Sequence, residues 1–130
     1  MLSFRLDTRS GLAAYLQIVR QVKHALRLGI LEVGDQLPTI KEVVAALAIN
    51  PNTVLKAYRE LEYEGLIDSR PGQGTFVIKT LAGPSLKMHA ALRRSLTGWI
   101  EEARAAGLDE EGIEALFLDT LRESEEAGVA

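Results

Sequence analysis

Residues 37–77 constrain the fold of this chain most, because they combine two short helical segments with a glycine-tipped hairpin. The first helix is expected to begin after Pro38, where Thr39 can cap its N-terminus and Glu42, three residues later, can complete a capping box. Its apolar residues follow the i, i+3, i+4, i+7 spacing of a helix that buries one face; they are Ile40, Val43, Val44 and Leu47. The pattern predicts a short amphipathic helix with a defined start.

A second helix follows after a turn of three residues. Asn50 is a favourable N-cap, and Pro51 suits the first helical position because the N–H that it lacks has no helical partner there. This recognition helix is predicted over residues 51–64, with Gly65 at its end. Its apolar side holds Val54, Ala57, Tyr58 and Leu61, and its opposite side holds Asn52, Lys56, Arg59 and Tyr63. A helix fits the major groove of DNA, where amides and cations read base edges and bind phosphates.

Two short strand-forming stretches come next, over residues 66–70 and 75–79. The tip between them, residues 71–74, contains two glycines that permit positive φ angles and a close approach of backbone N–H groups to phosphates. Arg70 and Gln73 add side-chain donors. Two capped helices followed by a hairpin predict a winged helix-turn-helix whose wing spans residues 70–75. The alternative is a hairpin that only closes the core, since turn glycines are common for conformational reasons alone.

Four segments between residues 15 and 77 carry a resemblance to a known family. They are YLQIVRQVKHALRLGIL, the GDQLP of residues 34–38, the INPNTVLKAYRELEYEGLI of residues 49–67 and the GQGTFV of residues 72–77. In this order and spacing they resemble the DNA-binding domain of the GntR family of bacterial transcription regulators. The INPNTV segment and the short tail are most similar to the YtrA-like subgroup, whose members resemble compact dimeric repressors. The resemblance implies a regulator that binds double-stranded DNA.

The DNA contacts of the family, carried over by position, fall on Lys41, on the start of the recognition helix and on the wing glycines. Donors and cations on the same surfaces extend this set. The predicted DNA-binding residues are Thr39, Lys41, Asn50, Pro51, Asn52, Thr53, Lys56, Arg59, Arg70, Gly72, Gln73 and Gly74. The chain departs from many relatives at Leu55, where they carry an additional cation, and a leucine there is expected to be neutral or to contact a thymine methyl.

Helices are also predicted on both sides of this motif. An amphipathic helix precedes it, with Ser10 or Thr8 as the expected cap and an end near Gly29, and forms the back wall of the domain. After residue 80, the sequence Leu81-Ala82-Gly83-Pro84 predicts a break, and Ser85 is the expected cap of a new helix. The chain therefore divides into a DNA-binding domain, residues 1–80, and a helical hairpin, residues 81–130.

The helical hairpin is predicted to be a dimerisation segment. Gly107 ends its first helix and Asp109 caps its second. The apolar stripes of both helices are expected to form the interface, through Leu92, Leu96, Trp99, Ala103, Ile113, Leu116, Phe117 and Leu121. Two helices cannot enclose these stripes alone, so a four-helix bundle with a second copy is expected, with or without exchange of helices between subunits. The alternative is that the helices pack back onto the winged domain.

Charge and composition limit the functions that this chain can have. The chain has a formal net charge of −3, but residues 1–80 hold ten Lys/Arg and eight Asp/Glu, which gives +2, whereas residues 81–130 hold five and ten, which gives −5. There is no cysteine, and His24 and His89 lie on different predicted helices, so no metal site or cofactor is expected. No catalytic pair and no phosphate-binding loop stands out, so an enzyme is not expected. Without a signal peptide or a long apolar run, a cytoplasmic protein is expected.

The sequence predicts a mainly α fold with a small β-wing: an N-terminal winged helix-turn-helix followed by a two-helix C-terminal dimerisation segment. The expected function is that of a homodimeric transcriptional repressor bound to an inverted-repeat operator. The alternative is a winged-helix protein–protein interaction module that does not bind DNA. Two helices enclose little volume for a small-molecule effector. No pattern in the sequence supports a site between subunits near Trp99, and Trp99 is expected to be a packing residue.

Overall fold

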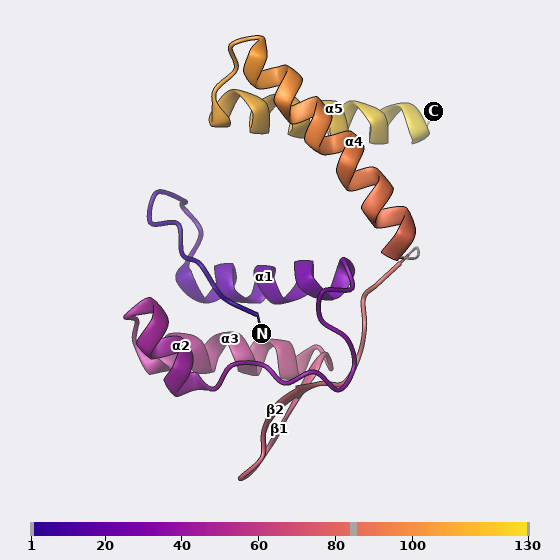
Figure 1. The fold of residues 1–130 in the computed structure, drawn as a ribbon. Coiled ribbons are helices and arrows are strands. Elements are labelled where there is room, and N and C mark those ends of the chain that lie inside the picture. The colour runs from indigo at the N-terminus through magenta and orange to yellow at the C-terminus, as the bar shows by residue number, and fades with distance from the viewer. Residues whose placement is uncertain (1, 84–85, 130) are drawn as a thin grey trace. The chain divides into compact units, whose positions relative to one another are not determined.

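The computed structural model describes residues 2–83 and 86–129, and over them the chain is mainly helical with one small antiparallel sheet (Figure 1). This confirms the predicted fold class. The elements are α1 (Ala14–Arg27), α2 (Ile40–Leu47), α3 (Pro51–Tyr63), β1 (Ile67–Arg70), β2 (Gly74–Val77), α4 (Leu86–Ala105) and α5 (Glu110–Val129). They form two compact units that divide between Leu86 and Lys87. The predicted break at Pro84 and cap at Ser85 lie outside the described residues.

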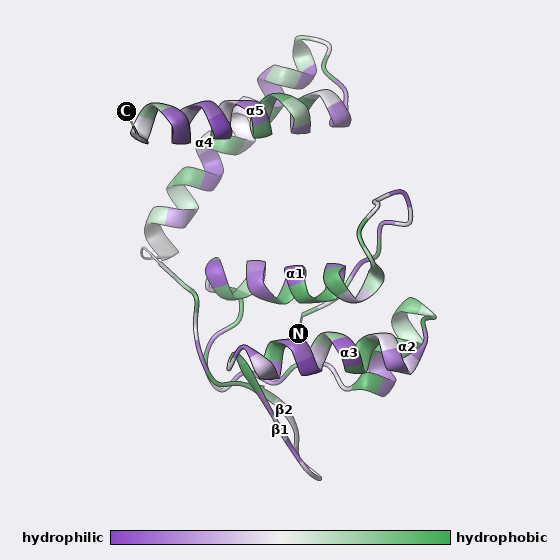
Figure 2. Ribbon diagram, turned by 180° about the vertical axis from the view of Figure 1, so that it is seen from behind, coloured by the Kyte–Doolittle hydropathy of each residue, from purple (hydrophilic) through white to green (hydrophobic). Residues whose placement is uncertain are grey.

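The N-terminal unit has a closed core between α1, α2, α3 and the hairpin. Figure 2 shows that the hydrophobic side of α1 faces α3, as its periodicity predicts. The largest side chains with almost no exposed surface come from all of these elements and from the loop before α2: Ile18, Val22, Leu26, Leu37, Val43, Val54, Leu61, Ile67 and Val77. Burial of each is worth about 1.5–3 kcal/mol, so this core can hold the unit together in a single copy.

The predicted cap of α1 is wrong. The helix begins at Ala14, its N-cap is Ala13, and no side chain caps it. The Ser10 hydroxyl instead accepts from the N–H of Leu12 (3.1 Å) and closes a local turn, while Thr8 lies further out in the preceding loop. The helix starts later than the polar residues suggest because residues 8–12 form turns of their own.

Two glutamines of α1 hold the segment that precedes it. The Gln21 amide accepts from the N–H of Arg5 (2.9 Å) and donates to its carbonyl (2.5 Å). One turn earlier, the Gln17 amide accepts from the N–H of Asp7 (2.8 Å) and donates to the carbonyl of Leu12 (2.9 Å). Each side chain satisfies backbone groups as a neighbouring strand would. The N-terminal segment is therefore fixed along α1, and this places Phe4 in the core.

A third extended segment, which the sequence analysis missed, lies beside β2. The strands β1 and β2 pair from Ile67 opposite Val77 to Arg70 opposite Gly74. On the free edge of β2, the N–H of Val77 donates to the carbonyl of Asp35 (2.8 Å), and the N–H of Leu37 donates to the carbonyl of Thr75 (2.8 Å). The residues before α2 thus tie the wing to the helix-turn-helix.

The C-terminal unit consists of α4 and α5. Gly107 has a φ of +98°, and the Asp109 carboxylate accepts from the N–H of Gly112 (2.8 Å), so the predicted helix end and cap are confirmed. The Trp99 and Phe117 rings approach to 6.4 Å between centroids. Two hollows of about 330 and 460 Å³ adjoin these rings. Most apolar side chains of the unit remain exposed. None of the described helices is long and apolar enough to cross a membrane.

Candidate nucleic-acid interface

Both helices of the helix-turn-helix begin with the predicted caps. The Thr39 hydroxyl accepts from the N–H of Glu42 and also donates to its carboxylate, both at 3.1 Å. The Glu42 carboxylate therefore completes the cap by accepting a hydrogen bond from the Thr39 hydroxyl. The Asn50 side chain accepts from the N–H of Asn52 (2.8 Å), and Pro51 occupies the first turn. Caps of this kind contribute about 0.5–2 kcal/mol each, which matters for helices as short as α2.

The turn between the helices depends on two further features. Ala48 ends α2 in the left-handed conformation, with φ +54°, and its N–H donates to the carbonyl of Val44 (2.9 Å). The Tyr58 hydroxyl of α3 donates to the carbonyl of Pro38 (2.6 Å), the residue just before the cap of α2. Burial raises the pKa of Tyr58 far above its ordinary value, and the negative charge of Glu42 raises it further. The hydroxyl thus stays protonated as a donor and locks the start of α2 onto α3.

The helical periodicity predicts Tyr58 on the buried side of α3 but does not indicate this hydrogen bond. A signal was present, since a tyrosine on an apolar helix face must find a partner for its hydroxyl. The identity of that partner, a backbone carbonyl 20 residues earlier, could not be read from the pattern.

The two sides of α3 lie as predicted. Val54, Ala57, Tyr58 and Leu61 are buried, and Asn52, Lys56, Arg59 and Tyr63 are exposed. Tyr63 is 90% exposed, so nothing in the unit covers the end of this face. An amide, two cations and an aromatic hydroxyl therefore form a continuous polar stripe along α3. Nothing in the unit prevents this stripe from entering a groove wide enough for a helix.

Two of the acids at the end of α3 are paired with neighbouring elements, and a third, Glu60, is exposed one turn after Lys56. Lys56 places its ammonium 4.1 Å from the centre of the Tyr15 ring of α1, which holds it by a cation–π contact. Glu64 forms an ion pair with Lys23 of α1 (2.7 Å), and Glu62 accepts from the Ser69 hydroxyl of β1. These two carboxylates are thus directed to neighbouring elements, whereas the exposed Glu60, one turn after Lys56, offsets part of the positive charge of the outward face.

The other predicted residues of the helix-turn-helix differ in how free they are. Lys41 is exposed on α2, and Pro51 is exposed at the start of α3. The Thr39 hydroxyl and the Asn50 carbonyl oxygen are engaged in the caps, so for a ligand Asn50 has its amide NH₂ left as a donor. Thr53 is half-buried.

The wing contains one cation, Arg70 at the end of β1, and its guanidinium is held against the strands of the hairpin. The Arg70 guanidinium lies 4.7 Å from the centre of the Phe76 ring, and its Nε is 3.5 Å from the Asp68 carboxylate. The tip beyond it, with Gly72 at φ +73° and Gln73, is exposed. Backbone groups and one amide are therefore what the wing tip presents.

Gly74 is favoured chiefly by its backbone conformation, which residues with a side chain rarely adopt. Its φ is +125°, and a Cβ at this position would collide with the side-chain amide of Gln36. That amide donates to the Gln73 carbonyl (3.4 Å), so Gln36 lies across the base of the tip. Gln36 was not among the predicted residues, because nothing in its local sequence indicates a contact 37 residues away.

Known proteins are similar to this chain over the region that contains the helix-turn-helix and the wing. The model of the family described as bacterial regulatory proteins, gntR family, matches residues 14–77, from α1 to the end of β2. The HTH-type transcriptional repressor YtrA of Bacillus subtilis (strain 168) is 37% identical over 84% of this chain and 85% of its own length. The chain belongs to the GntR family. It is a DNA-binding transcription regulator, and the relatives found are regulators rather than enzymes.

Two solved structures extend the comparison beyond the sequence of this GntR-family regulator. YtrA from Sulfolobus acidocaldarius, a GntR-family transcription factor, is 28% identical with a TM-score of 0.54 over 92% of this chain and 97% of that chain. The DNA-binding domain of AraR in complex with operator ORX1 is 25% identical, with a TM-score of 0.51, over 58% of this chain and 95% of that chain. The similarity to YtrA therefore includes the C-terminal unit, whereas AraR matches a smaller part of the chain.

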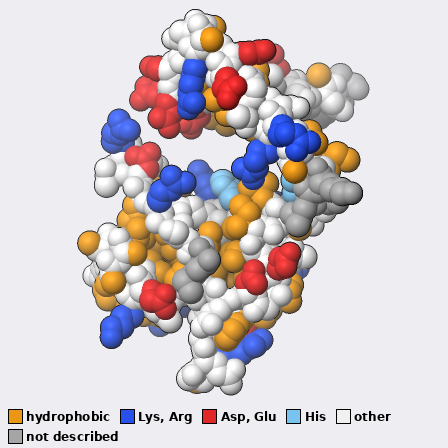
Figure 3. Space-filling view, in the orientation of Figure 1, with side chains coloured by type: hydrophobic (Ala, Val, Ile, Leu, Met, Phe, Trp, Pro, Cys, Tyr) orange, Lys and Arg blue, Asp and Glu red, His pale blue; other side chains and the backbone are white. Residues whose placement is uncertain are grey.

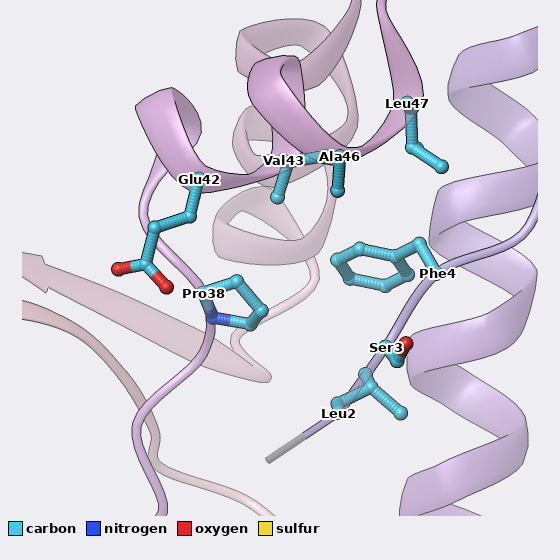
Figure 4. Close-up of a pocket in the computed structure, with 8 residues that line it drawn as sticks. All are labelled: Leu2, Ser3, Phe4, Pro38, Glu42, Val43, Ala46 and Leu47. Atoms are coloured by element: carbon cyan, nitrogen blue, oxygen red, sulfur yellow. The ribbon is translucent and has the colours of Figure 1, made fainter.

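One further cavity of this GntR-family chain lies beside α2 (Figure 4). Its volume is about 220 Å³, and it lies between the N-terminal segment, with Phe4, and α2, with Ala46 and Leu47. The only charged side chain at its edge is Glu42. It is smaller than ligand pockets of roughly 300 Å³ and more, and its walls are mostly apolar. Among residues 2–83 and 86–129, no group of three His, Asp or Glu side chains could hold a metal ion.

Proposed function

We propose that this regulator is a homodimeric repressor that places two copies of α3 on an inverted-repeat operator. The observation that carries the proposal is the open polar stripe of α3, held in place by the Tyr58 hydrogen bond and the two caps. A rigid reading surface keeps its groups aimed without a further ordering cost on binding. The repressor binds across the promoter and blocks access to it.

The roles within the stripe follow from chemistry and position. Asn52 lies in the first turn of α3, its side chain is exposed, and an amide can form two hydrogen bonds with an adenine edge. Lys56 and Arg59 follow one and two turns later and bind phosphates. Thr39, Lys41, Asn50, Pro51 and Thr53 flank this stripe. In the wing, Arg70, Gly72, Gln73 and Gly74 contact the backbone of an adjacent groove.

The dimer rests on the C-terminal unit. Five of the eight apolar residues assigned to the interface keep between 41% and 59% of their surface exposed: Leu92, Leu96, Leu116, Phe117 and Leu121. A monomer rarely exposes such a continuous apolar surface. The stripes of a second copy fill the hollows beside Trp99 and Phe117, and this produces a four-helix bundle with two-fold symmetry.

Charge supports the same assembly. A domain with a net charge of only +2 makes few phosphate contacts, so one copy binds weakly at physiological salt. Two linked copies gain from a high effective concentration at the second half-site, which raises affinity by about 10²–10⁴. A symmetric dimer also explains why a chain with a short wing and few cations can select one site.

Selection of bound fragments from random duplex DNA tests the proposal, together with light scattering of the free protein. The expected result is an inverted repeat whose half-sites are about 34–36 Å apart, or a multiple of this, and the mass of two chains. Recovery of a single, unrepeated site, or the mass of one chain, contradicts the dimeric arrangement. Absence of any enriched sequence contradicts base reading by Asn52.

A further inference from the structure

The outer side of α1 carries a cluster of positive charge that the proposed DNA interface does not use. Arg20, Lys23, His24 and Arg27 follow one another at helical spacing, and Lys and Arg side chains with a histidine gather along the edge of the N-terminal unit formed by α1 (Figure 3). Helix α1 contains no acidic residue. Like charges three or four residues apart destabilise a helix by about 0.2–0.5 kcal/mol per pair. The helix dipole favours basic residues in the last turn, His24 and Arg27, but it does not account for Arg20, which lies further from the helix end.

These charges are also poorly compensated by the rest of the unit. Lys23 has one partner, Glu64 of α3 (2.7 Å). Within the part of the chain that the structure describes, Arg20 and Arg27 form no ion pair or hydrogen bond, and both are exposed. A ligand with negative charge would meet two uncommitted guanidinium groups on one helix face.

The same side of α1 is hollowed and partly apolar. A groove of about 280 Å³ runs along it, with Leu12 and Leu16 toward the start of the helix and the basic residues toward its end. Val19 forms part of its floor. This volume is close to that of the smallest ligand pockets, about 300 Å³. We call these residues, Leu12, Leu16, Arg20, Lys23, His24 and Arg27, the α1 groove.

We propose that the α1 groove binds an amphipathic anion, a small molecule with an anionic head group and an aliphatic tail. The head group pairs with Arg20 and Arg27, and Lys23 and His24 are within the same basic end. The tail covers Leu12 and Leu16 and removes their apolar surface from water. DNA backbone is the less suitable ligand, because phosphates would leave the apolar half of the groove unused. The proposal depends neither on the dimer nor on the operator.

The test uses the full chain without DNA and titrates decyl phosphate below its micelle concentration, with binding measured by calorimetry. Saturable binding of one ligand per chain is expected. The double variant Arg20→Gln with Arg27→Gln is expected to weaken it at least tenfold. The matched control, Arg93→Gln with Arg94→Gln, removes the same charge from exposed arginines of α4 and is expected to leave binding unchanged.

Three comparisons decide the ligand class. Inorganic phosphate tests the head group alone, and decyltrimethylammonium tests the tail with the opposite charge; both are expected to bind much more weakly than decyl phosphate. Equal affinity for inorganic phosphate, or an equal loss in the α4 control variant, overturns the proposal. A third measurement uses random duplex DNA: if the α1 double variant lowers the salt dependence of DNA binding, the groove is a phosphate-contact surface instead. Failure to bind decyl phosphate also overturns the proposal, and it does so without affecting the operator results.

Discussion

The two units of this chain differ in whether one copy can complete its own core. The N-terminal unit buries large side chains from α1, α2, α3 and the hairpin, whereas the only buried hydrophobic residue in the described part of the C-terminal unit is the small Ala103. In the N-terminal unit, side-chain caps and the Tyr58 hydrogen bond also fix α2 and α3. The DNA-reading unit is therefore structurally self-sufficient, and the C-terminal unit presents surfaces suited to another copy.

The strongest test of this difference is Trp99→Arg. A charge among the stripes of α4 and α5 is expected to dissociate the dimer and to lower operator affinity by about 10²-fold, because the second half-site is no longer linked to the first. The fold of the N-terminal unit is expected to persist, which amide exchange of α1 and α3 measures. Leu118→Arg is the matched control, because Leu118 is an exposed apolar residue outside the predicted stripes. A variant that stays dimeric by light scattering contradicts the bundle.

Substitution of one leucine in each unit separates an internal core from an intermolecular one. Leu61→Ala removes a fully buried side chain of α3 and is expected to lower the free energy of unfolding of the N-terminal unit by about 2–5 kcal/mol. This loss should not depend on protein concentration. The effect of Leu121→Ala on α5 should depend on it, because in the proposed dimer the contact that it removes is between copies. Thermal unfolding over a hundredfold range of concentration distinguishes the two.

Within the reading surface, Asn52 and Lys56 are expected to act differently. Asn52→Ala should weaken operator binding by about 1–3 kcal/mol and leave binding to random DNA unchanged. Lys56→Ala should weaken binding to every sequence and lower the slope of log K against log salt by about one. Titrations on operator and random duplex at several salt concentrations measure both. Equal losses on the two duplexes for Asn52→Ala would refute its role in reading bases.

The Tyr58 hydrogen bond predicts a pH dependence of the stability of the N-terminal unit. The folded-state pKa of Tyr58 is raised above the value of about 10 for an unfolded chain, so the unfolded state loses this proton first. Its contribution is complete below pH 10 and declines as the pH rises further. Tyr58→Phe should lower stability by about 1 kcal/mol at pH 7 and flatten the decline above pH 10. Tyr63→Phe, at an exposed position, is the control and should do neither.

The sequence predicted the features whose signals are local. Caps at Thr39, Asn50 and Asp109 follow from residue types within one helical turn, and the two faces of α3 follow from a period of 3.6 residues. The same reasoning failed at the start of α1. There Ser10 has the right chemistry for a cap but serves a turn, and such turns compete with a helix start in ways that a single sequence does not rank.

The features that escaped prediction join residues far apart in the chain. The segment at residues 34–37 pairs with β2 through backbone groups, so it leaves no side-chain pattern. The hydrogen bond between the Gln21 side chain and the backbone of Arg5 was also unpredicted, because a backbone partner leaves no side-chain pattern at residue 5. For the predicted DNA-binding residues, the sequence could indicate which side chains are exposed. Whether each donor is free depends on contacts such as that of Arg70 with Phe76, which only the three-dimensional structure reveals.

The smallest expected effect concerns how the self-sufficient unit positions its wing. Gln36 is exposed, so Gln36→Ala should change stability by less than about 1 kcal/mol. Its amide nevertheless lies across Gly74 and donates to the Gln73 carbonyl, so its loss frees the wing tip to move. Operator affinity should fall several-fold, because ordering the tip then becomes part of the cost of binding. Gln73→Ala removes a tip donor but keeps the Gln36 contact, which is to the backbone. If the two variants lose equal affinity and amide exchange at the tip is unchanged in Gln36→Ala, the wing is positioned by β1 and β2 alone.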